Sequence, residues 1–215
     1  MAMTDWDACS ERLAAGMDAL GLSSAAEVRE RLIAYLHELT TWNATYNLTA
    51  VREPEAMVTR HLLDCLAVSD LVTGTNVVDV GTGPGLPGLV LAIIRPQLAV
   101  TLVESNRKKA TFLRHARRQL GLDNAEVVQS RVEAYTPAKR FDCVTTRAFA
   151  TAADTLRGAG HLVAPSGRVV LMKGRDPAAE MADLPRGFYH VETRPVSVPG
   201  LDAERHVVIL APELT

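Results

Sequence analysis

The sequence has few of the features that mark secreted, zinc-binding or membrane proteins. It contains three cysteines, Cys9, Cys65 and Cys143, and no pair is spaced as C-x-x-C, which argues against a disulfide framework and a zinc site. No run of about 18 apolar residues is present, so no segment is long enough to span a bilayer. The N-terminal stretch "MAMTDWDACSERLAAG" is acidic and polar, unlike a signal peptide. We therefore expect a cytoplasmic protein that has no metal site and makes no membrane contact.

Neither composition nor net charge indicates an unusual class of protein. Of 215 residues, 47% are apolar and 22% are charged, which suits one soluble globular unit, expected to be monomeric. A net charge of −2 does not by itself indicate a nucleic-acid partner. The stretch Arg107–Arg118 differs, because it contains six Lys and Arg residues. This basic run is compatible with RNA binding, and a solvent-exposed helix face explains it equally well.

The spacing of apolar residues changes near residue 72. Residues 1–71 have the pattern of helices, with Val28, Leu32, Leu36 and Leu39 on one helical face. From Asn76 on, short β-branched runs alternate with helical stretches, and the last two runs are adjacent. We predict an α/β fold with a seven-stranded, mostly parallel sheet over 72–215 and a helical N-terminal extension over 1–71. The predicted strands are Asn76–Val80, Leu98–Glu104, Ala125–Ser130, Phe141–Thr146, Gly167–Lys173, Phe188–Val196 and Glu204–Ala211.

The stretch "VVDVGTGPGLPG", Val77–Gly88, lies between the first predicted strand and a helix, as a nucleotide-binding loop does. Its "GPGLPG" satisfies the dinucleotide pattern G-x-G-x-x-G, and it also suits S-adenosylmethionine (SAM), which has no phosphate. Free N–H groups at a helix N-terminus hold a pyrophosphate. Pro84 and Pro87 remove two of these donors, and a hydrogen bond from each donor would stabilise a bound anion by about 1.5–3 kcal/mol. The prolines therefore favour SAM over a nicotinamide or flavin dinucleotide.

Two acidic residues strengthen the prediction of an adenosine-containing cofactor. Asp79 precedes the loop, where its carboxylate would attract the ammonium group of SAM, directly or through water. Glu104 ends the second predicted strand, where it would accept hydrogen bonds from both ribose hydroxyls. NAD sites use an acid at the same place, so Glu104 does not separate the cofactors. The seven predicted strands resemble the sheet of the class I (Rossmann-like) SAM methyltransferases more than the six-stranded dinucleotide sheet.

Missing motifs narrow the methyl acceptor. No [DN]-P-P-[YFW] motif of exocyclic-amine methylation follows Phe141–Thr146, and no Pro-Cys dipeptide supplies the nucleophile of pyrimidine C5 methylation. The tetrad of ribose methylation needs an early lysine, and the first lysine here is Lys108. These gaps favour an acceptor that is already nucleophilic, or one deprotonated by another route.

Several longer motifs resemble those of one known family. They are "WNATYNLTAVREPEAMVTRHLLDCLAV" (Trp42–Val68), "VDVGTGPGLPG" (Val78–Gly88), "QSRVEAY" (Gln129–Tyr135), "TRAFA" (Thr146–Ala150) and "LDAERHVVIL" (Leu201–Leu210). In these motifs the chain resembles the bacterial 16S rRNA guanine-N7 methyltransferases, also called glucose-inhibited division protein B or RsmG. The resemblance implies methyl transfer from SAM to N7 of one guanine, position 527 of the rRNA of the small ribosomal subunit.

The resemblance also implies a cofactor site. Gly81, Leu86, the pair Val132–Glu133 and Arg147 are implied to line it. Thr82, Gly83 and Gly85 of the glycine-rich loop are further candidates for cofactor binding. Gly81 permits close approach of the cofactor, Leu86 packs against it, and Val132 and Glu133 contact the adenine. We interpret Arg147 as the residue that orients the guanine, through its O6 atom, or the cofactor. A general base is not expected, because guanine N7 carries no proton.

Further residues are candidates for RNA binding. Asn47, Thr49, Arg60 and His61 are expected to border the same pocket, although helix capping and packing are equally good explanations for them. Lys173 and Arg175 are candidates for binding RNA phosphates. Other functions stay open at this point: a SAM enzyme acting on another RNA, a small molecule or a protein, an NAD-dependent oxidoreductase, and an RNA-binding module without activity.

Overall fold

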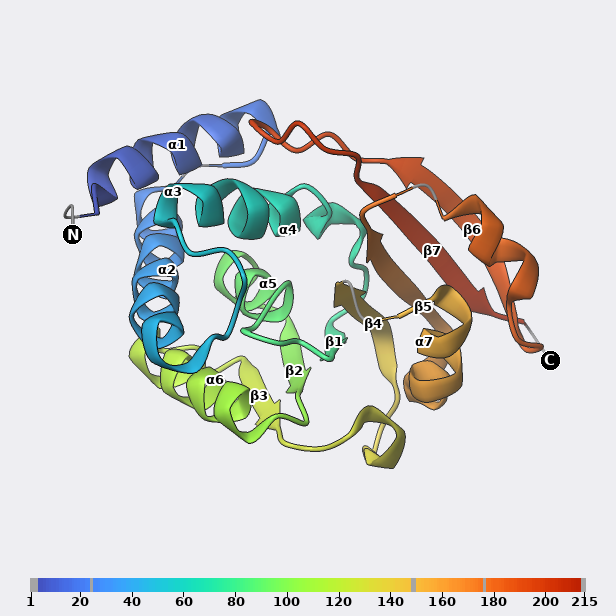
Figure 1. The fold of residues 1–215 in the computed structure, drawn as a ribbon. Helices are drawn as coiled ribbons and strands as arrows, with labels where there is room; N and C mark the ends of the chain where they lie inside the picture. Colours follow the sequence, from blue (N-terminus) through green and yellow to red (C-terminus); the bar gives the residue numbers. More distant parts are fainter. Residues whose placement is uncertain (1–3, 24, 148–149, 176, 214–215) are drawn as a thin grey trace.

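A computed structural model describes residues 4–23, 25–147, 150–175 and 177–213. Their strands form one seven-stranded sheet (Figure 1). The strand order is β3-β2-β1-β4-β5-β7-β6, and β7 is antiparallel to both of its neighbours. The predicted number of strands and the mostly parallel sheet are confirmed. The strands are β1 (Asn76–Val80), β2 (Ala99–Val103), β3 (Ala125–Val128), β4 (Phe141–Arg147), β5 (Val163–Lys173), β6 (Phe188–Pro195) and β7 (His206–Pro212).

The central strands are apolar because both faces of the sheet are covered. In β1, Val77 belongs to a hydrophobic cluster on one face, and Val78 and Val80 belong to a second cluster on the other. Successive side chains of a strand point to opposite faces, so a strand covered on both sides needs an uninterrupted apolar run. Asp79 interrupts the apolar run of β1, although it is fully buried.

The N-terminal helices share their core with the first face of the sheet. Leu13, Leu36, Leu89 and Phe112 come from four different helices and lie in one hydrophobic cluster with Ile209 of β7. The helical N-terminal extension therefore packs as part of the layer that covers the sheet (Figure 1). The helices of this layer are α1 (Trp6–Ala19), α2 (Ala26–Tyr46), α3 (Pro54–Met57), α4 (Asp64–Leu66), α5 (Gly88–Ile94) and α6 (Arg107–Gln119).

The second face is covered mainly by α7 (Ala152–Ala159) and by short 3-10 turns. A π-helical segment, Val58–Leu63, joins α3 to α4 on the first face. No helix of the described residues is both long and apolar enough to cross a membrane.

The strand order places the ends of β1 and β4 side by side. From β1 the chain continues to β2 and β3 on one side of β1, and β4 then pairs with the other side of β1. The direction in which strands are added therefore reverses between β1 and β4. Open α/β sheets bind ligands in the crevice at this point, beyond the carboxyl ends of the strands. The glycine–proline loop after β1 and Arg147 at the end of β4 both lie at this edge.

Candidate cofactor and substrate site

The glycine–proline loop uses its own amide groups for internal hydrogen bonds. Thr82 donates to the carbonyl of Val103, Gly85 and Leu86 both donate to the carbonyl of Thr82, and Leu89 donates to that of Gly85. The N–H groups of Gly83 and Gly88 bond to the carboxylates of Glu104 and Asp79. With Pro84 and Pro87 lacking an N–H, no backbone donor between Thr82 and Leu89 is left for an anion. This geometry disfavours a pyrophosphate cradle.

Glycine is required where the loop bends. Gly81, Gly83 and Gly85 all have positive φ, at 62°, 62° and 105°. At Gly85, an added Cβ would overlap the side chain of Leu89. The sharp bend therefore depends on the absence of side chains at these positions.

Asp79 lies behind the loop instead of on a cavity wall. Its carboxylate is fully buried, and Oδ2 accepts from the hydroxyl of Thr82 at 2.5 Å and the N–H of Gly88 at 2.7 Å. An added Cβ on Gly88 would come within 2.8 Å of the same carboxylate oxygen. In this structure Asp79 thus holds the loop in place, whereas the sequence suggested an interaction with the ammonium group of SAM.

Burial gives Asp79 an unusual titration. It raises the pKa of this carboxyl to about 7, although the Thr82 and Gly88 hydrogen bonds favour the charged form. The folded pKa is above the unfolded value of about 3.9, so the folded state binds the proton more tightly. We predict that wild-type protein loses stability relative to Asp79→Asn as the pH rises from about 4 to about 7, with a constant difference outside that range.

Urea unfolding at several pH values, without cofactor, measures this difference. The Asp79→Asn variant keeps a side-chain oxygen that can accept from Thr82 and Gly88, but its amide does not titrate. A pH-independent difference between the two proteins would contradict the assignment of Asp79 as the titrating group.

Glu104 follows β2 and joins two loops at the same edge of the sheet. One oxygen accepts from the N–H of Gly83 at 2.9 Å and the other from the N–H of Asn106 at 2.7 Å. The side chain is nearly buried, and these two bonds fix its carboxylate between the loops. Its role in binding the ribose hydroxyls stays a prediction.

Two cavities meet at Gly81. The smaller, of about 70 Å³, is lined in part by Val132 and Glu133, whose contact with the adenine stays a prediction. The larger, of about 410 Å³, contains Leu86, Arg147 and Lys173 and is open to solvent. We call the larger one the central cavity. Its other lining residues are Leu48, Thr49, Asp64, Gly81, Thr82, Gly83, Pro84, Lys109, Met172, Gly174 and Arg205.

Arg147 is oriented by groups from the N-terminal helices. Its Nη1 donates to the carbonyl of Arg60 at 2.9 Å and to Oδ2 of Asp64 at 3.2 Å. The other oxygen of Asp64 accepts from Nε of Arg205 at 2.7 Å. Asp64 is almost completely buried and thus holds two arginines, from β4 and from the residue before β7, at the wall of the central cavity.

His61 supports this cluster as a neutral side chain. Burial, followed by the nearby charge of Arg147, lowers its pKa to about 4. Its Nδ1 lies 2.9 Å from the carbonyl of Arg60, which can only accept, so we assign the proton to Nδ1. Nε2 then accepts from the hydroxyl of Thr49 at 2.9 Å.

The remaining RNA-binding candidates lie in different places. Asn47 ends α2 in a left-handed conformation and accepts a hydrogen bond from Arg52, and it does not line the central cavity. Lys173 lines the cavity, but its ammonium binds Glu180 at 2.9 Å and the carbonyl of Ala150 at 2.6 Å. Arg175 is exposed on the segment after β5.

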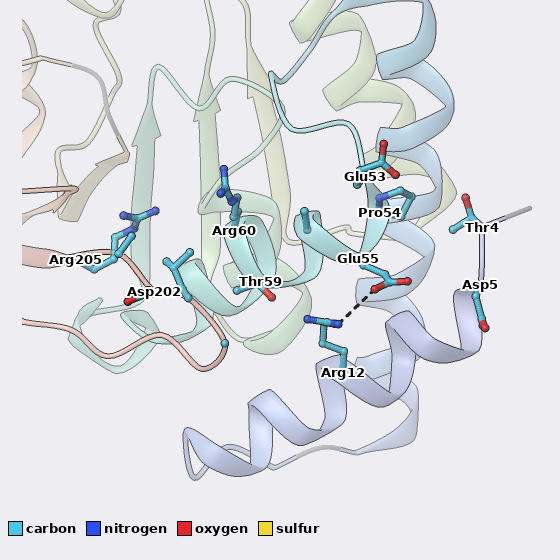
Figure 2. A pocket seen from close by; sticks show the side chains of 14 residues that line it. Thr4, Asp5, Arg12, Glu53, Pro54, Glu55, Thr59, Arg60, Asp202 and Arg205 are labelled. Carbon is cyan, nitrogen blue, oxygen red and sulfur yellow. Dashed lines mark hydrogen bonds and ion pairs between the residues drawn. The ribbon is translucent and has the colours of Figure 1, made fainter. Parts of the chain in front are cut away.

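Arg60 lines a neighbouring cavity of about 850 Å³, which is larger than the central cavity (Figure 2). This cavity lies between α1, the segment around α3 and the loop before β7, and the ion pair between Arg12 and Glu55 lies in it. Arg205 borders both cavities. The larger cavity lacks the glycine–proline loop and Arg147, so its size does not make it the reaction site.

Sequence reasoning missed two charged residues of the central cavity, Asp64 and Arg205, and included a third, Lys109, only within the basic run Arg107–Arg118. Asp64 and Arg205 occur within the motifs "RHLLD" and "ERHVV", but their pairing joins segments 141 residues apart. Ala148 and Phe149, in the "TRAFA" motif, lie outside the described residues. Among described residues, no group of His, Cys, Asp and Glu is arranged to hold a metal ion.

Comparisons with known proteins agree with this geometry. A family model described as "GidB: rRNA small subunit methyltransferase G" matches residues 28–208. "Ribosomal RNA small subunit methyltransferase G" of Stenotrophomonas maltophilia (strain K279a) is 53% identical over 193 residues, 90% of each chain. The protein of the same name from Xanthomonas campestris pv. campestris (strain 8004) is 50% identical over 201 residues, 94% of each chain.

A solved structure with low sequence identity shares the fold. The glycopeptide N-methyltransferase MtfA, crystallised with SAM, has a TM-score of 0.57 and 14% identity over 71% of this chain and 88% of its own. This likeness and the sheet order confirm the predicted class I methyltransferase fold. With the family model and the relatives matching most of its length, the chain belongs to the rRNA small subunit methyltransferase G family.

Proposed function

We propose that this protein transfers a methyl group from SAM to N7 of a guanine in 16S rRNA, position 527 in the usual numbering, within the small ribosomal subunit. The observation that carries the proposal is the central cavity, in which the glycine–proline loop and the oriented Arg147 face the same space. Family membership supports an RNA acceptor in the small subunit. The cytoplasmic location and the monomeric state expected from the sequence stay predictions.

The residues around Gly81 fit SAM better than a dinucleotide. From Thr82 to Leu89 the loop has no free amide donor, so it offers little to a diphosphate, whereas SAM contains no diphosphate. Val132 and Glu133 would contact the adenine, Glu104 the ribose, and Gly81, Thr82, Gly83, Gly85 and Leu86 the rest of the cofactor. When bound, SAM supplies an electrophilic methyl group on a sulfonium.

The acceptor needs orientation more than proton transfer. Guanine N7 has an in-plane lone pair and no hydrogen, so the cavity has no need of a general base. Correct alignment of two reactants can contribute roughly 7–11 kcal/mol to lowering a barrier. A neutral His61 is consistent with a reaction that needs orientation and no proton transfer. It fixes the backbone near Arg147 and is not available as a cationic acid at neutral pH.

Arg147 is the group that we assign to guanine. A guanidinium donates readily to the two acceptors of guanine, O6 and N7. N7 stays accessible to the methyl group only if Arg147 donates to O6 alone. Asp64 and the carbonyl of Arg60 restrict Arg147 from one side, which favours a single direction for its remaining donors. The target base must be unstacked or presented by a loop to enter the cavity.

Mapping of N7-methylguanosine in 16S rRNA tests the proposal. We expect one such nucleotide to disappear from cells lacking the gene, and purified protein with tritiated SAM to restore it on 30S particles from those cells. Label in several nucleotides, or in small molecules only, would contradict the proposed acceptor. Binding of NAD without binding of S-adenosylhomocysteine in titration calorimetry would contradict the cofactor.

A further inference from the structure

A basic and aromatic surface lies beside the mouth of the central cavity. It is formed where the first turn of α6 meets the C-terminal end of α2 and the loop after it (Figure 1). We call it the α6 surface and define it by five side chains. Tyr46, Arg52, Arg107 and Lys108 are exposed, and Lys109 is half-buried.

The positive charge of α6 is not neutralised within the protein. None of its six Lys and Arg residues forms an ion pair with any of the residues that the structure describes. Arg114 and Arg117 bond to neutral groups instead, the side chain of Gln129 and the carbonyl of Leu122. Three of the cations, Arg107–Lys109, occupy the first helical turn, where the helix dipole disfavours positive charge. Folding alone does not explain this placement, whereas a bound anion would.

Tyr46 is an exposed ring with a fixed position. It is 42% exposed, and its centroid lies 5.3 Å from that of Trp42. Trp42 in turn packs against the buried ring of Phe112, at 5.7 Å, which anchors the pair to the core. The ammonium of Lys108 lies 6.0 Å from the centre of the Tyr46 ring. An aromatic ring next to cations is the arrangement by which proteins bind single-stranded nucleic acids.

The α6 surface is continuous with the proposed reaction site. Lys109 lines the central cavity, next to the glycine–proline loop. Tyr46 is followed after one residue by Leu48 and Thr49, which line the same cavity. An RNA strand with its guanine in the cavity therefore has neighbouring nucleotides close to this surface.

We propose that the α6 surface binds the single-stranded RNA segment that flanks the target guanine, with a neighbouring base stacked on Tyr46 and phosphates bound by Lys108, Lys109 and Arg52. A duplex is a poorer fit, since its bases expose no free face for stacking. An acidic protein would satisfy the cations but has no base for Tyr46. This inference rests on the proposed function and extends it to the recognition of the flanking strand.

Steady-state kinetics with unmethylated 30S particles test the role of Tyr46. Stacking of one base on an aromatic ring corresponds to a change in affinity of roughly 5- to 150-fold. We expect Tyr46→Leu to raise KM for the particles within this range with little change in kcat. Tyr46→Phe keeps the ring and should retain the wild-type KM. Tyr189→Leu is the matched control, because Tyr189 is similarly exposed, at 46%, on strand β6 at the edge of the sheet.

Salt dependence tests the phosphate contacts. With a uridine homopolymer as the probe, the slope of log K against log salt concentration should become shallower by about 0.7 in Lys108→Ala for the lost phosphate contact. Binding of an RNA duplex of equal length should be weaker than that of the homopolymer in the wild type. A duplex bound more tightly, or an unchanged slope, would overturn the inference.

Separate outcomes distinguish this inference from the proposed function. Binding of S-adenosylhomocysteine by a variant establishes that the variant has folded. If Tyr46→Leu does not fold, the salt dependence of Lys108→Ala tests the inference in its place. Wild-type protein that methylates no rRNA would contradict the proposed function. The outcome is different if the wild type methylates rRNA while Tyr46→Leu leaves KM unchanged, or while Tyr46→Phe raises KM as much as Tyr46→Leu does. Either result would contradict the RNA-binding role of the α6 surface and leave the proposed function intact.

Discussion

Arg147→Ala is expected to lower kcat/KM for methylation of 30S particles by about 100- to 1000-fold, the loss that follows removal of one preorganised donor from a reaction site. Arg147 reaches the central cavity from the end of β4, and its side chain is held by Asp64 and the carbonyl of Arg60. A mobile replacement donor, such as water, would have to be ordered in each turnover. Single-turnover methylation with saturating SAM measures the effect.

Two further variants sharpen this test. Arg147→Lys keeps the charge but loses the planar fork of donors, so its activity should lie between those of the wild type and the alanine variant. Arg157→Ala removes an exposed arginine of α7 whose only ion pair, among described residues, is with Asp154, and it should methylate at the wild-type rate. Folding of Arg147→Ala should be little affected, because Asp64 retains Arg205. Wild-type rates in Arg147→Ala would remove its proposed role.

Asp64→Ala is expected to lower the free energy of unfolding by about 3–5 kcal/mol, as removal of one partner from a buried ion pair does. The substitution would leave Arg147 and Arg205 near each other without the carboxylate that lies between them. Methylation should also fall, since Arg147 would lose the carboxylate that orients it together with the carbonyl of Arg60. Urea denaturation measures the loss of stability.

The double variant Asp64→Ala with Arg205→Ala separates repulsion from lost packing. If repulsion between the arginines causes the instability, the double variant should be more stable than Asp64→Ala alone. Asp154→Ala is the matched control, because it breaks an exposed arginine–aspartate pair and a hydrogen bond from Thr151, and should lower the free energy of unfolding far less than Asp64→Ala does. Equal effects of Asp64→Ala and Asp154→Ala would contradict the structural role of Asp64.

The sheet could be predicted from sequence because its signals are local. Each predicted strand is a short apolar or β-branched run, and all seven occur within a few residues of their predicted bounds. The start of β5 differs, at Val163 instead of Gly167. Its pairing with β4 shifts there, and an added Cβ on Gly167 would lie 2.8 Å from the carbonyl of Phe141. The spacing of apolar residues in a sequence does not indicate where two backbones approach so closely.

The site was only partly predictable, since its charged groups meet through the tertiary fold. The loop and Glu104 follow directly from strand ends, so their place at one edge could be inferred. The position of Asp79 behind the loop depends on how closely Gly88 packs, which no pattern of residue types specifies. The pairing of Asp64 with Arg205 depends on the return of the chain in β7, far along the sequence. The roles assigned to the individual site residues remain predictions.

The common hydrophobic cluster of the N-terminal helices and the sheet has a consequence for folding during synthesis. The helices leave the ribosome first, but apolar residues such as Leu13 and Leu36 pack in one cluster with Val207 and Ile209. Those residues belong to β7, which is translated after every other strand of the sheet. The nascent chain must therefore keep an incompletely covered apolar surface until β7 has been synthesised, which makes it a candidate for chaperone binding during elongation.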